Sequence, residues 1–251
     1  MELAAFIEEM KNRAERALLA LSGDGRSTAQ SFQFGVGRAE ITTIRTSAVE
    51  KASISHMALE GVPDPVTGNR FDTTVYQMEI FPTNPHCPMG HFNVESTVIG
   101  AEATYHMNLD IFPATEHEAD AAKLRGVMDA VADRFGLDRT AAREGLGLQY
   151  RMPHWPKPLA AMAGFQLKAQ REGRRALLYE AYRAFFDAYA DTLERRKNEP
   201  YTAEEDRARL ERNGRWLEYI ALKDRAVKAA LAIGIPSEVI IALSFPPSAV
   251  F

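Results

Sequence analysis

The sequence has little cysteine, no excess of positive charge and no long apolar run. Its single cysteine, Cys87, cannot form an intramolecular disulfide, and the acidic start MELAAFIEEM is unlike a signal peptide, so we expect an unprocessed cytoplasmic protein. The longest apolar stretches, such as residues 239–243, fall far short of the roughly 20 residues that cross a bilayer, which predicts no membrane span. With 30 Lys and Arg against 34 Asp and Glu, the formal net charge of -4 argues against a nucleic-acid partner.

The 251 residues, 46% hydrophobic and 25% charged, have the composition of an ordinary globular protein. Apolar residues at helical spacing predict long helices at 3–21, 116–135 and 174–196. Residues 32–111 are rich in Thr, Val, Ile, Phe and Tyr with alternating character, which predicts four or more antiparallel strands. The pattern therefore predicts one α+β domain over residues 1–251, in which helices cover an antiparallel sheet.

The later part of the chain is interpreted less directly. Three prolines make residues 150–158 a structured loop, because proline interrupts a helix. Residues 215–222 are interpreted as a strand, 224–233 as a short helix or turn, and 238–244 as a last strand.

The most informative stretch is a predicted hairpin between residues 91 and 110. Gly100-Ala101 suits a two-residue turn, which would place Ile99 opposite Glu102 and fix the register of the two strands. Because strand residues alternate between faces, one face of this hairpin is polar. Three directly opposed pairs are then expected on it, with Cβ atoms about 4.5 to 5.5 Å apart: His91 with Asp110, Asn93 with Asn108, and Glu95 with His106. A polar face of this kind is also common on hairpins that have no function other than facing solvent.

Several segments, in order along the chain, resemble the oxygen-dependent coproporphyrinogen oxidases of haem biosynthesis. FPTNPHCPMGHFNV is similar to the family's H-P-x-N-P-x-x-P-x-x-H-x-N-V, and NLDIFP lies where the family has G-F-D-L-T-P. LERRKNEPY is similar to E-R-R-K-x-x-P-Y, and NGRWLEYIALKDR to R-G-R-Y-V-E-F-N-L-x-Y-D-R. GRAEITTIRTSAVEKASIS and VIIALSFPP match two further segments. The similarity extends over most of the chain.

The resemblance implies a large antiparallel sheet flanked on both faces by helices, usually in a homodimer. It also implies a chemistry in which O2 oxidises two propionate side chains to vinyl groups with loss of CO2, without an organic cofactor. The family's motif histidine and its aspartate, which holds pyrrole N–H groups, match His91 and Asp110, which we take as catalytic candidates. The candidate substrate-binding residues are Asn93 and Asn108 of the hairpin, His154 of the loop at 150–158, and Arg215 of the segment NGRWLEYIALKDR.

The departures from the family pattern concern its basic and glycine positions. Glu95, Trp155 and Leu159 stand at arginine positions, His106-Met107-Asn108 replaces a glycine run, and residues 235–237 replace G-G-R. A like-charge pair about 4 Å apart costs on the order of 4 kcal/mol at an effective dielectric of about 20. A tetra-anionic substrate is therefore disfavoured, and we expect a substrate that is smaller or less acidic than coproporphyrinogen.

Two versions of the site remain open. In one, His91, Glu95 and His106, with Asp110 as a second carboxylate, bind non-haem Fe(II), Mn or Zn; the plainer alternative is an ion pair between Glu95 and His106. In the other version, which is metal-free, Asp110 holds a cationic or N–H-rich substrate while His91 orients a reactive oxygen species or moves a proton.

Three functions follow from these observations. The first is O2-dependent oxidation of a small molecule, with oxidative decarboxylation as one form. The second is a catalytically inactive homodimer that binds a small molecule or tetrapyrrole. The third is a genuine coproporphyrinogen III oxidase.

Overall fold

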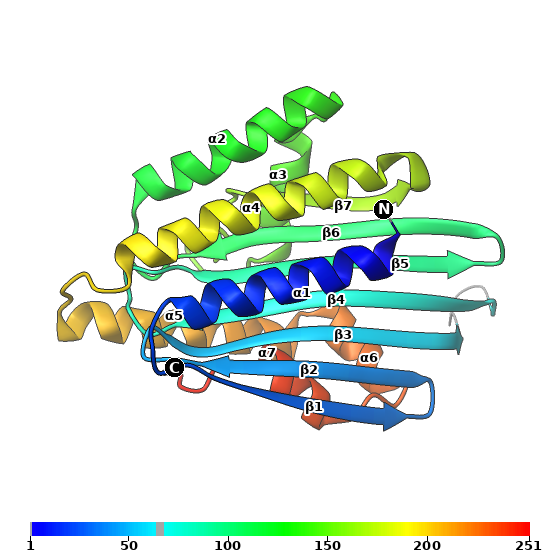
Figure 1. The fold of residues 1–251 in the computed structure, drawn as a ribbon, viewed down its shortest axis with the longest axis horizontal. Coiled ribbons are helices and arrows are strands. Elements are labelled where there is room, and N and C mark those ends of the chain that lie inside the picture. Colours follow the sequence, from blue (N-terminus) through cyan, green and yellow to red (C-terminus); the bar gives the residue numbers. More distant parts are fainter. Residues whose placement is uncertain (1, 64–67) are drawn as a thin grey trace.

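A single seven-stranded antiparallel sheet organises the described part of the protein. The computed structural model describes residues 2–63 and 68–251. Each strand pairs with the next one in the sequence, so the sheet is a simple meander (Figure 1). The strands are β1 (Arg26–Phe34), β2 (Gly37–Arg45), β3 (Val49–Pro63), β4 (Arg70–Pro82), β5 (Met89–Ile99), β6 (Glu102–Phe112) and β7 (Phe165–Arg171).

Helices cover both faces of this sheet, which confirms the predicted α+β class. One face carries α1 and α4, with α2 packed on α4, and the other face carries α5, α6 and α7 (Figure 1). The helices are α1 (Leu3–Ala20), α2 (Glu118–Phe135), α3 (Arg139–Gln149), α4 (Arg175–Arg196), α5 (Ala203–Leu222), α6 (Arg225–Ala232) and α7 (Ser237–Ser244), with a short 3-10 turn at Glu172–Arg174. No helix in the described ranges is long and apolar enough to cross a membrane.

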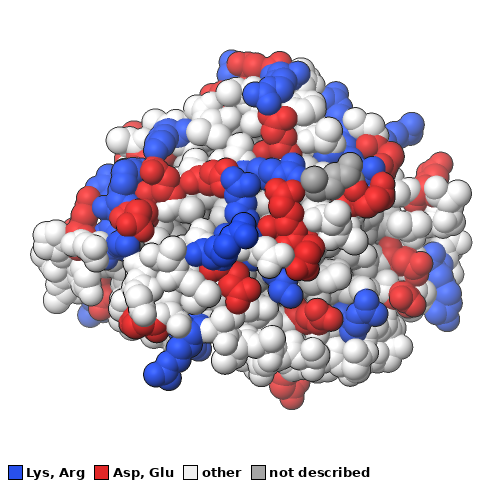
Figure 2. All heavy atoms as spheres, viewed as in Figure 1, with Lys and Arg blue, Asp and Glu red and all other residues white. Residues whose placement is uncertain are grey.

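The exposed surface over α1 and α4 mixes charges of both signs. Figure 2 shows basic and acidic side chains interleaved on this face rather than gathered into a patch of one sign. Many of them form ion pairs between helices, such as Arg183 with Glu9 at 2.6 Å and Lys123 with Asp191 at 2.5 Å. The expectation of no nucleic-acid partner stays a prediction.

Strand β5 shows why the hairpin has two unlike faces. Phe92 points toward α4, where its ring lies 5.3–5.8 Å from the rings of Tyr182, Phe185, Phe186 and Tyr189. Buried aromatic clusters of this kind contribute strongly to stability. They fix which side of β5 faces the core, and the alternation then sends the polar residues to the α5–α7 face.

The two late strands predicted from the sequence are wrong, since residues 215–222 belong to α5 and 238–244 to α7. Buried side chains of α5 do recur at spacings of three and four: Arg209, Arg212, Asn213, Trp216, Tyr219 and Ile220. Because half of them are polar, they form no apolar stripe in the sequence. The segment of α7 is a short apolar run, for which periodicity alone does not separate strand from helix.

Between residues 136 and 233, a helix and a strand were not predicted from the sequence, whereas a loop and a short helix were. Helix α3 was not predicted, although Asp138 caps it by accepting the backbone N–H groups of Thr140 and Ala141 at 3.0 and 3.2 Å. Strand β7 was also missed. The loop at 150–158 and the short helix within 224–233 are confirmed, the latter as α6.

Candidate active site

The hairpin register predicted from the turn at Gly100 is confirmed. Gly100 has a φ of +62°, in the left-handed region that glycine adopts without strain. Strands β5 and β6 pair Ile99 with Glu102, and the three polar pairs follow along the strands: His91 with Asp110, Asn93 with Asn108, and Glu95 with His106. Strand β4 lies beside β5 and adds further polar side chains to the same face of the sheet.

His91 forms a buried pair with an acid that sequence reasoning missed. Glu79 of β4 lies opposite His91, whose Nδ1 donates to Glu79 Oε1 at 2.9 Å. His91 is 6% exposed and Glu79 is fully buried, and Glu79 Oε2 has no hydrogen-bond partner among the described residues. The rings of Tyr150 and Trp216 lie 5.7 and 5.6 Å from the imidazole. The alternation along β4 could have indicated Glu79, because Gln77 and Glu79 share one face of that strand.

The protonation of this pair follows from its burial. Burial alone would lower the pKa of His91, but the adjacent Glu79 carboxylate outweighs it, so the pKa of His91 is raised above its ordinary value. Burial raises the pKa of Glu79, which His91 and Gln77 oppose by donating hydrogen bonds to it. The site therefore holds a proton more firmly than a free imidazole would.

This pair predicts a pH dependence of stability. Because the pKa of His91 is raised in the folded protein, its stabilising contribution is complete below the ordinary value of 6.5 and is lost as pH rises through the folded pKa. We expect the free energy of unfolding, measured by urea denaturation from pH 6 upward, to fall over this window. The fall should be smaller in Glu79→Gln, and an unchanged slope in that variant would contradict the assignment.

Asp110 is held by the protein's own backbone. Its Oδ2 accepts the N–H of Met162 at 2.8 Å, and its Oδ1 accepts those of Ala163 and Gly164 at 2.9 and 3.2 Å. Burial raises the pKa of Asp110 to about 6, against the opposing effect of these backbone hydrogen bonds. Met162 has a φ of 53°, unusual for a residue with a side chain, so the carboxylate fixes a constrained turn.

The two asparagines of the hairpin belong to separate amide chains. Asn93 donates to Gln77 Oε1 at 3.4 Å, and Gln77 in turn donates to Glu79 at 2.8 Å. Asn108 Oδ1 accepts from Gln166 of β7 at 3.1 Å. The Gln166 amide also donates to Gln149 of α3, whose own amide reaches the Tyr219 hydroxyl at 3.2 Å. Polar groups from β4, β5, β6, β7, α3 and α5 thus converge on one side of the sheet.

The proposed set of four metal ligands does not come together. His91 with Asp110 and Glu95 with His106 are each opposed across the hairpin, but the two pairs lie four residues apart, about 13 Å along a strand. His106 Nδ1 instead accepts the backbone N–H of Ala169, at 3.3 Å. Within residues 2–63 and 68–251, the ligand atoms of these four side chains do not form a common group. Residues opposed across two strands are close, but each residue along a strand adds about 3.3 Å, which separates the two pairs.

The two remaining candidates lie toward the loop at 150–158. His154 is largely exposed and its Nε2 lies 2.9 Å from Glu218 of α5. Arg215 of α5 lines a cavity of about 260 Å³ between that loop and the start of α2, which Lys157 and Arg125 also border.

Comparisons with known proteins agree with this architecture. The family model described as coproporphyrinogen III oxidase matches residues 4–251. The chain belongs to this family. Among its relatives are the oxygen-dependent coproporphyrinogen-III oxidases of two strains of Coxiella burnetii, RSA 493 / Nine Mile phase I and Dugway 5J108-111. Each is 23% identical over 274 residues, covering 100% of this chain and 87% of the relative.

Family membership supports an oxidase-like function with O2 as the oxidant. Within this frame, two positions where the resemblance places arginines are filled by buried apolar side chains. Trp155 and Leu159 are 5% and 6% exposed and pack in one cluster with Tyr150 and Trp216. The Trp155 indole N–H donates to Glu218 at 3.0 Å. Trp155 and Leu159 therefore belong to the apolar cluster whose Tyr150 and Trp216 rings lie next to His91. The homodimer stays a prediction.

Proposed function

We propose that this family member carries out the O2-dependent oxidation of a small, electron-rich molecule, and that coproporphyrinogen is not its substrate. The observation that carries the proposal is the apolar filling at Trp155 and Leu159, with Glu95 at a third arginine position. These replacements remove basic partners for acidic groups, which favours a ligand with few carboxylates.

The residues of the polar face are assigned roles from their contacts. In a two-electron oxidation the substrate gives up a hydride equivalent to O2, and one further proton completes H2O2. If a carboxylate is lost in the same step, its carbon leaves as CO2 and a double bond remains. His91, whose charged form Glu79 favours, supplies or positions the proton. Asp110 shapes the adjacent turn, and Asn93 and Asn108 offer amide groups to the ligand.

A second function, binding without catalysis, is favoured by one feature. The Asp110 carboxylate already accepts three backbone N–H groups, so it has little capacity left for the N–H groups of a substrate. A protein that has lost the family's catalytic use of this aspartate could keep the sheet as a binding surface. Such a protein consumes no O2 with any ligand.

The coproporphyrinogen prediction is tested by a direct assay. We expect no conversion of coproporphyrinogen to protoporphyrinogen under air at enzyme concentrations that give complete conversion by the Coxiella burnetii relative, which serves as the positive control. Porphyrin fluorescence after chromatography measures both compounds. Conversion at a comparable rate would show a genuine coproporphyrinogen III oxidase instead.

Oxidation of other molecules is measured with an oxygen electrode and an H2O2 assay over electron-rich amines and pyrrole carboxylic acids. For a compound that is oxidised, His91→Gln is expected to lower kcat by about 100-fold or more, the usual contribution of positioned proton transfer. Binding of compounds without any O2 uptake would favour the non-catalytic alternative.

A further inference from the structure

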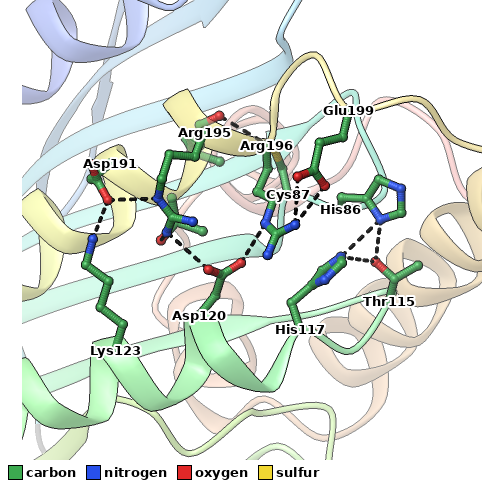
Figure 3. A network of polar contacts seen from close by, with 12 residues as sticks. His86, Cys87, Thr115, His117, Asp120, Lys123, Asp191, Arg195, Arg196 and Glu199 are labelled. Atoms are coloured by element: carbon green, nitrogen blue, oxygen red, sulfur yellow. Dashed lines mark hydrogen bonds and ion pairs between the residues drawn. The ribbon is translucent and has the colours of Figure 1, made fainter.

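A second cluster of ligand-type side chains lies at the end of the sheet, away from the polar face of the hairpin. His86 follows β4, His117 precedes α2, and Glu199 lies between α4 and α5 (Figure 3). One ligand atom from each of the three lies within 4.8 Å of the other two. Sequence spacing did not single out these residues, because three connections far apart in the chain bring them together.

The two imidazoles already stand at the separation that one metal ion requires. His86 Nδ1 and His117 Nε2 are 3.0 Å apart. Two nitrogens bound about 2.0–2.1 Å from one tetrahedral zinc ion are about 3.3 Å apart. A shift of a few tenths of an ångström therefore converts the contact between the rings into a shared ion. Thr115, 3.3 Å from both nitrogens, lies beside the same point.

The outer contacts of His86 orient its lone pair toward this point. His86 Nε2 lies 3.2 Å from the carbonyl oxygen of Pro200, which can only accept a hydrogen bond. Nε2 therefore carries the proton, and Nδ1 presents its lone pair to the space it shares with His117. A histidine that ligates metal usually donates its second N–H to a carbonyl or carboxylate in this way. Asn84 holds the backbone N–H of His86 at 2.9 Å and keeps the loop in place.

Glu199 supplies the third ligand and is itself fixed. Both of its carboxylate oxygens accept from Arg196 Nη1, at 2.7 and 2.8 Å, while Arg196 Nε donates to Asp120 at 2.8 Å (Figure 3). A carboxylate has about four lone-pair sites, so one oxygen can bind an ion while the other keeps Arg196. Asp120 offsets the positive charge of Arg196 next to the ion.

The cluster also opens onto the 260 Å³ cavity. His86 and His117 both contribute to its lining, together with Arg215 and Lys157. An ion held by three protein ligands keeps at least one coordination position for water or a ligand, as in catalytic zinc sites. That position can face the cavity.

We propose that His86, His117 and Glu199 bind a divalent first-row transition ion, such as Zn²⁺, at the edge of this cavity. Two imidazoles and one carboxylate suit such ions rather than Mg²⁺ or Ca²⁺, which prefer oxygen ligands. The site uses none of the hairpin residues, so it stands whether or not the proposed oxidation is correct.

Titration of tag-free, metal-stripped protein tests the site, with Zn²⁺ followed by calorimetry and Co²⁺ by its visible absorption. We expect one ion per chain with micromolar or tighter affinity. His86→Ala and His117→Ala should each weaken binding by more than about 100-fold, and Glu199→Gln by about 10- to 100-fold. His56→Gln, a half-buried histidine on β3, is the matched control and should bind like the wild type.

Thermal unfolding of each variant without metal establishes that it is folded. Should His86→Ala fail to fold, His117→Ala and Glu199→Gln carry the comparison. Three results would overturn the proposal: no stoichiometric ion in the wild type, wild-type affinity in the folded His and Glu variants, or an equal loss in His56→Gln.

Discussion

Replacing Asp110 by alanine is expected to lower the free energy of unfolding by about 3 kcal/mol or more. The substitution leaves the backbone N–H groups of residues 162–164 without their acceptor, and each buried unpaired group costs about 1–3 kcal/mol. The turn at Met162 also loses the contact that holds its unusual backbone conformation. Urea denaturation at pH 7 measures the loss, and a change under about 0.5 kcal/mol, typical of surface substitutions, would contradict it.

Asp110→Asn is the matched control. Asparagine keeps one acceptor oxygen, so two of the three N–H groups can stay paired while one faces an NH2 group. We expect a loss of roughly a third to a half of that in Asp110→Ala. The comparison also bears on function. If folded Asp110→Asn oxidises its substrate at the normal rate, this aspartate has a structural role only. If the folded variant loses turnover, the aspartate takes part in the reaction.

The pairing of β5 with β6 could be predicted from the sequence, because it depends on residues close together in the chain. The glycine turn and the alternation of polar and apolar residues together set the register of β5 and β6, and the structure has the same register. A one-residue slip would have buried Glu95 among the aromatic side chains of α4, so pattern and turn support one another.

The rest depended on contacts between segments distant in the chain. Glu79 pairs with His91 across β4 and β5, and its strand was never aligned with the hairpin from the sequence. The backbone N–H groups that donate to the Asp110 carboxylate belong to residues 162–164, about 50 positions away in the chain. Helix α5 was misread because Arg209 and Arg212, which a sequence rule places on the surface, are buried; Arg212 reaches the carbonyl of Phe112 at 2.6 Å. Tertiary hydrogen bonds thus overrode the polarity pattern.

The buried pair of Glu79 and His91 is expected to give a large effect when only one partner is removed. His91→Leu leaves the Glu79 carboxylate fully buried with the neutral Gln77 amide as a donor but without its charged partner, and breaking a buried pair in this way costs about 3–5 kcal/mol. Glu79→Met leaves an imidazole that can become neutral, so we expect a smaller loss of about 1–3 kcal/mol. Urea denaturation at pH 7 compares both variants with the wild type.

The double variant Glu79→Met with His91→Leu separates structure from function. Apolar residues of similar volume often replace a buried ion pair at little cost, so the double variant should be more stable than His91→Leu alone. Additive losses would contradict a coupled pair. If stability returns while O2 consumption does not, the pair is kept for proton transfer, because packing alone does not need it. If both return, His91 belongs to the scaffold, and the proposed oxidation must use other residues of the polar face.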